Sequence, residues 1–145
     1  MSKVLLLEDQ ILIAMMFDDI LSDMGHRVVG IAATCDTGMS LLLNEKPDFA
    51  VIDLHLADGP CYDLIAEAKM RNIPIVVITG AMIDHADERL ANTKILSKPF
   101  DPDQLKAVVA ELSALSERQS STNNGVVGAE RRSNKFMDEG ADSSP

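Results

Sequence analysis

The sequence predicts an α/β fold in which a doubly wound, five-stranded parallel sheet carries helices on both faces. Two observations lead to this prediction. Short apolar runs alternate with segments of helical periodicity along the first 118 residues, as expected when parallel strands are joined by helices. Several of the runs are apolar throughout, which is typical of strands that are buried on both faces of a sheet.

The first half of the chain predicts three strands and two helices. The strands are expected at residues 4–7, 27–33 and 49–53, and the helices at residues 10–25 and 34–46. Gly25 marks the end of the first helix, and Thr34 is the expected N-cap of the second. The inner face of the first helix is predicted to consist of apolar residues at helical spacing, namely Ile13, Met16, Phe17, Ile20, Leu21 and Met24.

The second half predicts two more strands and three more helices. The strands are expected at residues 74–79 and 94–96, and the helices at residues 60–71, at residues 81–92 and from Asp101 onward. The segment 81–92 has few apolar anchors and predicts a weaker helix. The last helix has a strong start signal, with Asp101 as N-cap, Pro102 at the first helical position and Gln104 as capping-box partner.

Composition divides the chain and limits its function. From residue 119 the sequence is rich in Ser, Asn and Gly and loses its periodicity, which predicts a domain at residues 1–118 and a flexible polar tail at residues 119–145. The formal net charge of −10 disfavours direct binding to nucleic acid, because phosphate backbones are repelled.

The cysteines and the apolar runs indicate the expected location. Cys35 and Cys61 have neither CxxC nor metal-site spacing, so reduced thiols in a cytosolic protein are expected. The longest apolar run, residues 11–17, is too short to span a membrane, and no signal peptide opens the chain. A cytoplasmic protein without membrane contact is therefore expected.

Polar side chains follow four of the predicted strands. Glu8 and Asp9 follow the first strand, Asp53 ends the third, Thr79 ends the fourth, and Lys98 follows the fifth. In doubly wound sheets, ligands bind beyond the carboxyl ends of the strands, at the point where the strand order reverses. We therefore expect these side chains to lie along one edge of the sheet.

This combination of residue types suits phosphoryl chemistry. Three neighbouring carboxylates repel one another, and Mg²⁺ with its oxygen ligands is a natural partner for them. Lys98 can hold a phosphoryl oxygen as a point charge, Thr79 can donate to another, and a carboxylate between them can act as nucleophile. Taken singly, each residue is a common turn former or helix-terminal acid; their occurrence together favours a site.

Four segments resemble a known family. "LLLED", "VIDLHLADG", "VITGA" and "LSKPF" resemble the signature segments of the receiver domain of two-component response regulators, of the stand-alone type. The resemblance covers residues 3 to about 118 and implies a flavodoxin-like fold. It also implies that Asp53 is the phosphoacceptor of a phosphorelay.

The resemblance assigns roles to the remaining residues as well. It implies that Asp9 binds Mg²⁺ directly, that Glu8 acts mainly through water, and that Asp53 and the backbone carbonyl of His55 complete the metal ligands. Thr79 and Lys98 would hold the phosphoryl oxygens, and the Lys98–Pro99 bond is typically cis in the family.

The sequence also departs from the family pattern. Ile95 stands where the family usually has an aromatic residue that rotates on activation. His55 and Ala81 occupy the two positions that tune dephosphorylation. Since Ile95 has no ring, the response to phosphorylation is expected to be carried mainly by residues 80–92.

The resemblance implies a signalling protein whose only catalysis is its own phosphorylation and dephosphorylation. A sensor histidine kinase or histidine phosphotransfer protein would supply the phosphoryl group, and the tail offers no output domain. The signal would then pass by contact with a downstream protein or by onward phosphotransfer. Two alternatives are a receiver-like scaffold that acts without phosphorylation and a phosphatase of the haloacid-dehalogenase type. That phosphatase needs a second Asp where this chain has His55.

Overall fold

The computed structural model describes residues 1–80 and 87–131, with side chains as far as residue 119. The chain divides into two units, with the boundary in the sequence between Ser113 and Ala114. The first unit contains the sheet, the core and all residues of the candidate site.

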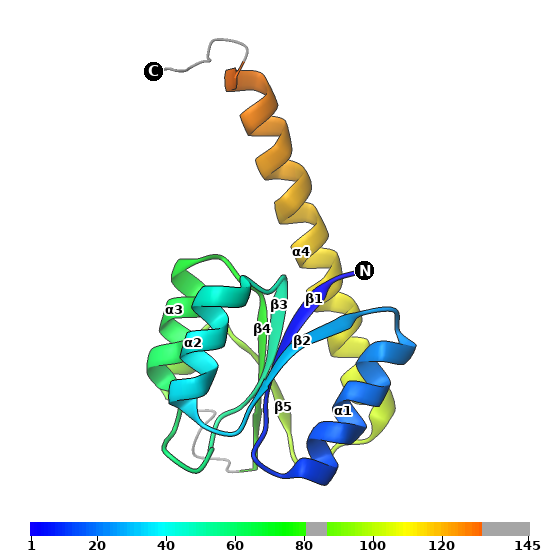
Figure 1. The fold of residues 1–145 in the computed structure, drawn as a ribbon, viewed down its shortest axis with the longest axis vertical. Coiled ribbons are helices and arrows are strands. Elements are labelled where there is room, and N and C mark those ends of the chain that lie inside the picture. Colours follow the sequence, from blue (N-terminus) through cyan, green and yellow to red (C-terminus); the bar gives the residue numbers. More distant parts are fainter. Residues whose placement is uncertain (81–86, 132–145) are drawn as a thin grey trace. The chain divides into compact units, whose positions relative to one another are not determined.

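Five parallel strands form the sheet, in the order β2-β1-β3-β4-β5 (Figure 1). Their bounds are β1 Lys3–Leu7, β2 Arg27–Ala32, β3 Phe49–Asp53, β4 Ile75–Thr79 and β5 Lys94–Ser97. The strand order reverses between β1 and β3, as the doubly wound prediction requires. The register pairs Asp53 with Ile78 and Thr79 with Ser97, so β3, β4 and β5 end at nearly the same level.

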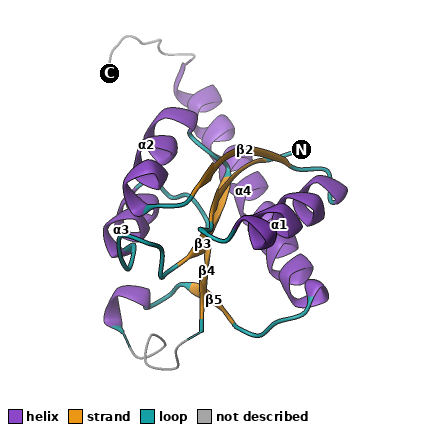
Figure 2. Cartoon of the chain, turned by 60° about the horizontal axis from the view of Figure 1, so that its bottom comes forward, coloured by secondary structure: helices purple, strands orange, loops and turns teal. Residues whose placement is uncertain are grey.

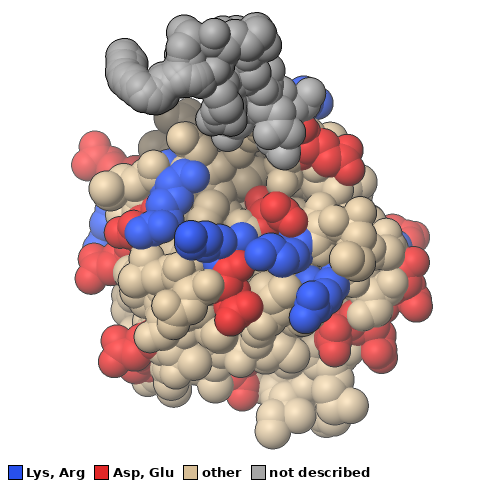
Figure 3. Space-filling view, turned by 45° about the horizontal axis from the view of Figure 1, so that its top comes forward, with Lys and Arg blue, Asp and Glu red and all other residues tan. Residues whose placement is uncertain are grey.

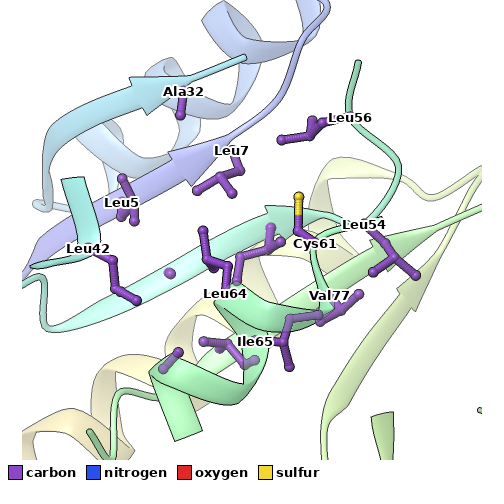
Figure 4. Packing of buried hydrophobic residues seen from close by; sticks show 14 of the residues in the cluster. Leu5, Leu7, Ala32, Leu42, Leu54, Leu56, Cys61, Leu64, Ile65 and Val77 are labelled. Carbon is purple, nitrogen blue, oxygen red and sulfur yellow. The ribbon is translucent and has the colours of Figure 1, made fainter. Parts of the chain in front are cut away.

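Helices cover both faces of the sheet (Figure 2). They are α1 (Ile11–Asp23), α2 (Cys35–Glu45), α3 (Tyr62–Met70) and α4 (Pro102–Arg131). Apolar side chains of α2 and α3 pack with one face of the sheet, and those of α1 and the first part of α4 pack with the other. Figure 4 shows the first of these two clusters, in which Leu64, Ile65 and Cys61 lie among the strand residues. The predicted fold class is confirmed.

The residues predicted to cap helices form the expected hydrogen bonds. The Thr34 hydroxyl oxygen accepts from the Thr37 N–H at 3.2 Å. The Gln104 N–H donates to Asp101 Oδ1, and the Asp101 N–H donates to Gln104 Oε1, each at 2.9 Å. This reciprocal pair is a capping box. Gly25 follows α1 with a positive φ of 89°, which is the conformation that glycine adopts readily at a helix end.

The structure differs from the sequence prediction in two segments. Met16 is 39% exposed, whereas Ala14 is buried, because the buried stripe of α1 is centred on Phe17 and leaves Met16 at its margin. Of the weak helix expected at residues 81–92, residues 81–86 lie outside the described part of the chain, and Glu88–Leu90 forms the short 3-10 helix η2. Helix α4 extends to Arg131; the division into a domain at 1–118 and a tail at 119–145 stays a prediction.

The prediction of two reduced thiols is wrong for this structure. Cys35 and Cys61 form a disulfide with an S–S distance of 2.02 Å and a Cα–Cα distance of 5.5 Å. Cys35 is the first residue of α2, and Cys61 is the N-cap of α3. Because α2 and α3 pack on the same face of the sheet, their N-terminal ends meet, and the sequence separation of 26 residues does not reveal this.

Charged side chains of both signs share the molecular surface. On the face seen in Figure 3, Lys and Arg side chains lie in a band with Asp and Glu side chains among and around them. On this face the basic side chains therefore have acidic neighbours.

The capping box allows a test of how α4 begins. Asp101→Ala removes the acceptor for the Gln104 N–H and should lower the free energy of unfolding by about 1 kcal/mol, the usual effect of losing an N-cap. Asp101→Asn keeps an acceptor oxygen and should stay close to wild type. Urea unfolding measures both variants, and equal stabilities of Asp101→Ala and wild type would contradict a contribution from the cap.

Candidate functional site

The carboxyl ends of the central strands gather the predicted residues. Because all strands are parallel, the side chains that follow β1, β3, β4 and β5 meet at one edge of the sheet. Strands β3 and β4 are buried along their whole length, so Asp53 and Thr79 stand at the ends of rigid elements. Asp53 is 5% exposed and Thr79 is 1% exposed.

An acidic cluster lies at this edge. Glu8, Asp9 and Asp53 each offer a carboxylate oxygen, and these oxygens lie within 4.8 Å of one another. Glu8 and Asp53 are buried, and Asp9 is exposed. The structure therefore brings together the three carboxylates that the sequence predicted to be neighbours.

Glu8 is the most poorly compensated of the three. Its Oε2 accepts from the Gln10 N–H at 3.0 Å, but its Oε1 is buried and has no hydrogen-bond partner in the described part of the chain. Burial raises the pKa of Glu8 above its usual value, and the nearby charge of Asp53 raises this pKa further. A buried oxygen of this kind costs free energy unless a proton or a cation approaches it.

This donor set fits a hard divalent cation. Mg²⁺ prefers oxygen ligands and is usually held by one or two carboxylates together with water and phosphate oxygens. A carboxylate oxygen without a partner, beside two further carboxylates, offers such ligands. His55 lies on the same loop, and its backbone N–H donates to Asp53 Oδ1 at 3.2 Å; metal binding by its carbonyl stays a prediction.

The Lys98 ammonium group, which directly follows β5, lies beside the acids. Lys98 Nζ lies 3.1 Å from Asp53 Oδ2, and the two side chains are 34% and 7% exposed. The Lys98 N–H donates to the Thr79 carbonyl oxygen at 2.9 Å, which fixes the lysine backbone beside the end of β4. The Lys98–Pro99 bond is cis. Among the described residues, the site thus combines three carboxylates, a hydroxyl and one cation.

Three positions depart from the family pattern, and His55 among them is described above. Ile95 lies in β5 and is partly buried against the cluster under α2 and α3. Ala81 lies outside the described residues.

Sequence reasoning missed how the loop after β3 is held. The Asp58 carboxylate accepts from the Cys35 N–H at 2.6 Å and from the Asp36 N–H at 3.2 Å. These bonds, the one to Cys35 above all, lower the pKa of Asp58. A carboxylate at a helix N-terminus is a common stabilising arrangement, but here it comes from a distant loop.

Comparison with known proteins identifies a family. A model of the response regulator receiver domain matches residues 4–110. The phyllosphere-induced regulator PhyR of Methylorubrum extorquens is 30% identical over 114 residues, which are 76% of this chain and 43% of that protein. The photosynthetic apparatus regulatory protein RegA of Rhodobacter capsulatus is 34% identical over 91 residues, 59% of this chain and 50% of that protein. The chain spans about half the length of the curated relatives it matches.

Solved structures show the same likeness. The response regulator PhyR from Brucella abortus matches with a TM-score of 0.68 and 31% identity, over 90% of this chain and 53% of that one. SdrG from Sphingomonas melonis matches with a TM-score of 0.67 and 30% identity, over 77% of this chain and 96% of that one. None of the helices in the described part of this chain has the length and apolar character needed to cross a bilayer.

The burial of Glu8 predicts a stability that depends on pH. Because the pKa of Glu8 is raised above 4.5 in the folded protein, the folded state holds more protons than the unfolded state just above pH 4.5. The contribution of Glu8 to stability is therefore lost as pH rises through its folded pKa. Without metal at pH 7, Glu8→Gln should be more stable than wild type by about 1 kcal/mol, the lower end of the cost of an unsatisfied buried group.

Urea unfolding at several pH values, in the presence of a chelator, measures this difference. The exposed Glu45→Gln is the matched control and should follow wild type at every pH. A Glu8→Gln variant with the same stability as wild type from pH 4.5 to pH 7 would show that burial of Glu8 carries no penalty.

Proposed function

The chain belongs to the response regulator receiver domain family, and from this premise we propose that Asp53 accepts a phosphoryl group in the presence of Mg²⁺. The donor would be the phosphohistidine of a sensor histidine kinase or of a histidine phosphotransfer protein. The observation that carries the proposal is the setting of Asp53. This buried carboxylate ends a central strand and belongs to an acidic cluster with Glu8 and Asp9, and the Lys98 ammonium lies 3.1 Å from it.

The reaction is an in-line transfer between a nitrogen and an oxygen. A carboxylate oxygen of Asp53 attacks the phosphorus, a P–O bond forms, and the P–N bond of the donor breaks with its electron pair remaining on the imidazole. Bound Mg²⁺, held by Glu8, Asp9, Asp53 and the His55 carbonyl, would supply positive charge to the phosphoryl oxygens. The imidazole leaves as a neutral group when its other ring nitrogen carries a proton, so the site needs no acid of its own. Positioning and electrostatics would then supply most of the catalysis.

Lys98 and Thr79 complete the proposed site. Both oxygens of Asp53 already have partners, since Oδ1 accepts from the His55 N–H and Oδ2 from Lys98. As the phosphoryl group arrives, the Lys98 ammonium would move from the carboxylate to a phosphoryl oxygen, and the Thr79 hydroxyl would donate to another. Attack by water on the same phosphorus would later release phosphate, which makes dephosphorylation a property of this site as well.

Two features support phosphorylation over the alternatives. An inert scaffold has no need for two buried carboxylates with an unpartnered oxygen, because this arrangement costs stability. A haloacid-dehalogenase phosphatase needs an acid two residues after its nucleophile, and this position holds His55.

Output by protein contact or onward phosphotransfer, and a cytoplasmic location, belong to the same proposal. So does a response carried by residues 80–92, of which residues 81–86 lie outside the described part of the chain. Lys69 of α3 holds the end of this segment, because its Nζ donates to the Ala91 carbonyl oxygen at 2.8 Å. A movement of the segment on phosphorylation would have to break this hydrogen bond.

Asp53→Asn tests the phosphoacceptor. Wild-type protein incubated with Mg²⁺ and a small-molecule phosphodonor should gain the mass of one phosphoryl group, and Asp53→Asn should gain none, because the amide is not a nucleophile of this kind. Intact mass spectrometry measures the gain. The exposed acid Asp63 provides the control, since Asp63→Asn should be phosphorylated like wild type. A base-labile phosphate on Asp53→Asn would show that another residue is the acceptor.

Asp9→Ala tests the metal site. Loss of this carboxylate should weaken Mg²⁺ binding by more than roughly tenfold, since even outer-shell partners of a metal commonly contribute 10–100-fold. Calorimetric titration measures the affinity, and phosphorylation should slow in parallel. Asp18→Asn, on α1 and away from this edge, serves as control. Wild-type Mg²⁺ affinity in Asp9→Ala would contradict the proposed ligand.

A further inference from the structure

We propose that the Cys35–Cys61 disulfide is a reversible redox tether on the loop that carries the phosphoacceptor. In this proposal a dithiol reductant opens the tether and a disulfide oxidant closes it. The bond joins the N-terminal ends of α2 and α3, and Cys61 ends the loop that begins directly after Asp53. The effect on phosphorylation rests on the function proposed above, whereas the redox chemistry and the change in the loop do not.

The loop of residues 54–61 is anchored at three places. The Leu54 N–H donates to the Ile78 carbonyl oxygen at 3.0 Å, and the Cys61 N–H donates to the Leu54 carbonyl oxygen at 3.1 Å. Asp58 binds the first two amides of α2. The disulfide adds a covalent link to α2 beside the Asp58 contacts, so it restrains a loop that already has a defined position.

Close packing surrounds the disulfide. A methyl group built on Gly59 would lie 3.1 Å from Cys35 Sγ, so the loop backbone passes directly against the sulfur. Movement of the Cys35 side chain away from Cys61 would therefore release the part of the loop around Gly59. The hydrogen bonds from the backbone amides of Cys35 and Asp36 to Asp58 would remain, so reduction should loosen the loop without unfolding it.

A short chain of bonds links the disulfide to Asp53. The Cys61 amide is bonded to the carbonyl of Leu54, and Leu54 follows Asp53 directly. The His55 N–H, one residue further, donates to Asp53 Oδ1. Greater mobility of Cys61 would therefore also loosen the backbone of residues 54 and 55, which positions one oxygen of Asp53.

Access to the two sulfurs is unequal. Cys61 is 2% exposed, whereas Cys35 is partly exposed and both border a surface cavity of about 370 Å³. A thiolate can thus approach Cys35 Sγ from the cavity. Attack there forms a mixed disulfide and breaks the Cys35–Cys61 bond, with the electron pair leaving on Cys61. The second thiol of the reductant then displaces Cys35, so both cysteines are reduced and the dithiol is oxidised.

The proposed cytoplasmic location favours a reversible role for the disulfide. In cytosolic proteins disulfides are usually transient and serve catalysis or redox sensing rather than permanent stabilisation. In a cytoplasmic receiver, this disulfide would therefore open or close with the thiol–disulfide balance of the cell, and the loop that carries the phosphoacceptor would change with it.

The first experiment tests the tether itself. The full chain is treated with oxidised glutathione or with dithiothreitol, both cysteines are assayed by alkylation and intact mass, and amide hydrogen exchange is followed. Oxidised protein should resist alkylation. Reduced protein should be alkylated at both cysteines after unfolding and should exchange faster at residues 55–61. Complete alkylation after treatment with oxidised glutathione, or equal exchange in the two states, would overturn the proposal.

The second experiment tests its consequence. Oxidised protein should take phosphate from a small-molecule donor, and bind Mg²⁺, about fivefold better than reduced protein, near the lower end of typical coupling between sites. Cys35→Ser, which leaves the buried Cys61 in place, should behave like reduced protein under both conditions. Equal Mg²⁺ affinity and equal rates in both states would contradict the coupling.

The two proposals can fail separately. If wild-type protein gains no phosphate in either redox state, the phosphoacceptor assignment fails. The differences in amide hydrogen exchange at residues 55–61 and in Mg²⁺ affinity between the oxidised and reduced protein then still test the tether. Asp53→Asn supplies the reference, because it cannot be phosphorylated at this position but keeps both cysteines.

Discussion

The arrangement of the site depends on holding two carboxylates, Glu8 and Asp53, out of water beside each other. Burial disfavours the charged form of Glu8, and the nearby charge of Asp53 adds to this effect. Asp53 is compensated by Lys98 and by the His55 N–H, whereas Glu8 has, among the described residues, a backbone donor on one oxygen only. The site therefore has more negative charge than the protein offsets, which suits it to a cation and, once a cation is bound, to phosphoryl oxygens.

Such a site needs a rigid support, and the order of the sheet provides it. Strands β1, β3 and β4 lie at the centre, and almost all of their residues are buried. The edge strand β2 is mostly exposed or partly exposed. Glu8 and Asp53 thus follow strands whose backbone is fixed by neighbours on both sides. Flexible loops alone would let the carboxylates turn toward solvent and relieve the repulsion that makes the site useful.

Most of the fold and of the acidic site could be predicted from the sequence because the signals for them are local. Apolar runs define the strands, the Asp101 and Gln104 pair defines the start of α4, and acids at strand ends meet wherever parallel strands end together. What could not be predicted depends on contacts between distant segments. The Cys35–Cys61 bond and the Asp58 cap both join the loop after β3 to α2, and no spacing rule connects residues that far apart. Met16 was misplaced for a different reason, since helical spacing gives the direction of a face but not its width.

The exposure of Lys98 has a further consequence for how the site can work. A fully buried ion pair is strongly destabilised when one partner leaves, because the other charge stays behind without compensation. The Lys98 side chain is 34% exposed, whereas the Asp53 side chain is only 7% exposed, so the ammonium stays in contact with solvent while the carboxylate depends on its protein partners. Departure of the ammonium alone would leave the Asp53 charge buried and uncompensated. The transfer of Lys98 to a phosphoryl oxygen would therefore accompany the formation of the acyl phosphate, in which the Asp53 carboxylate loses its own charge.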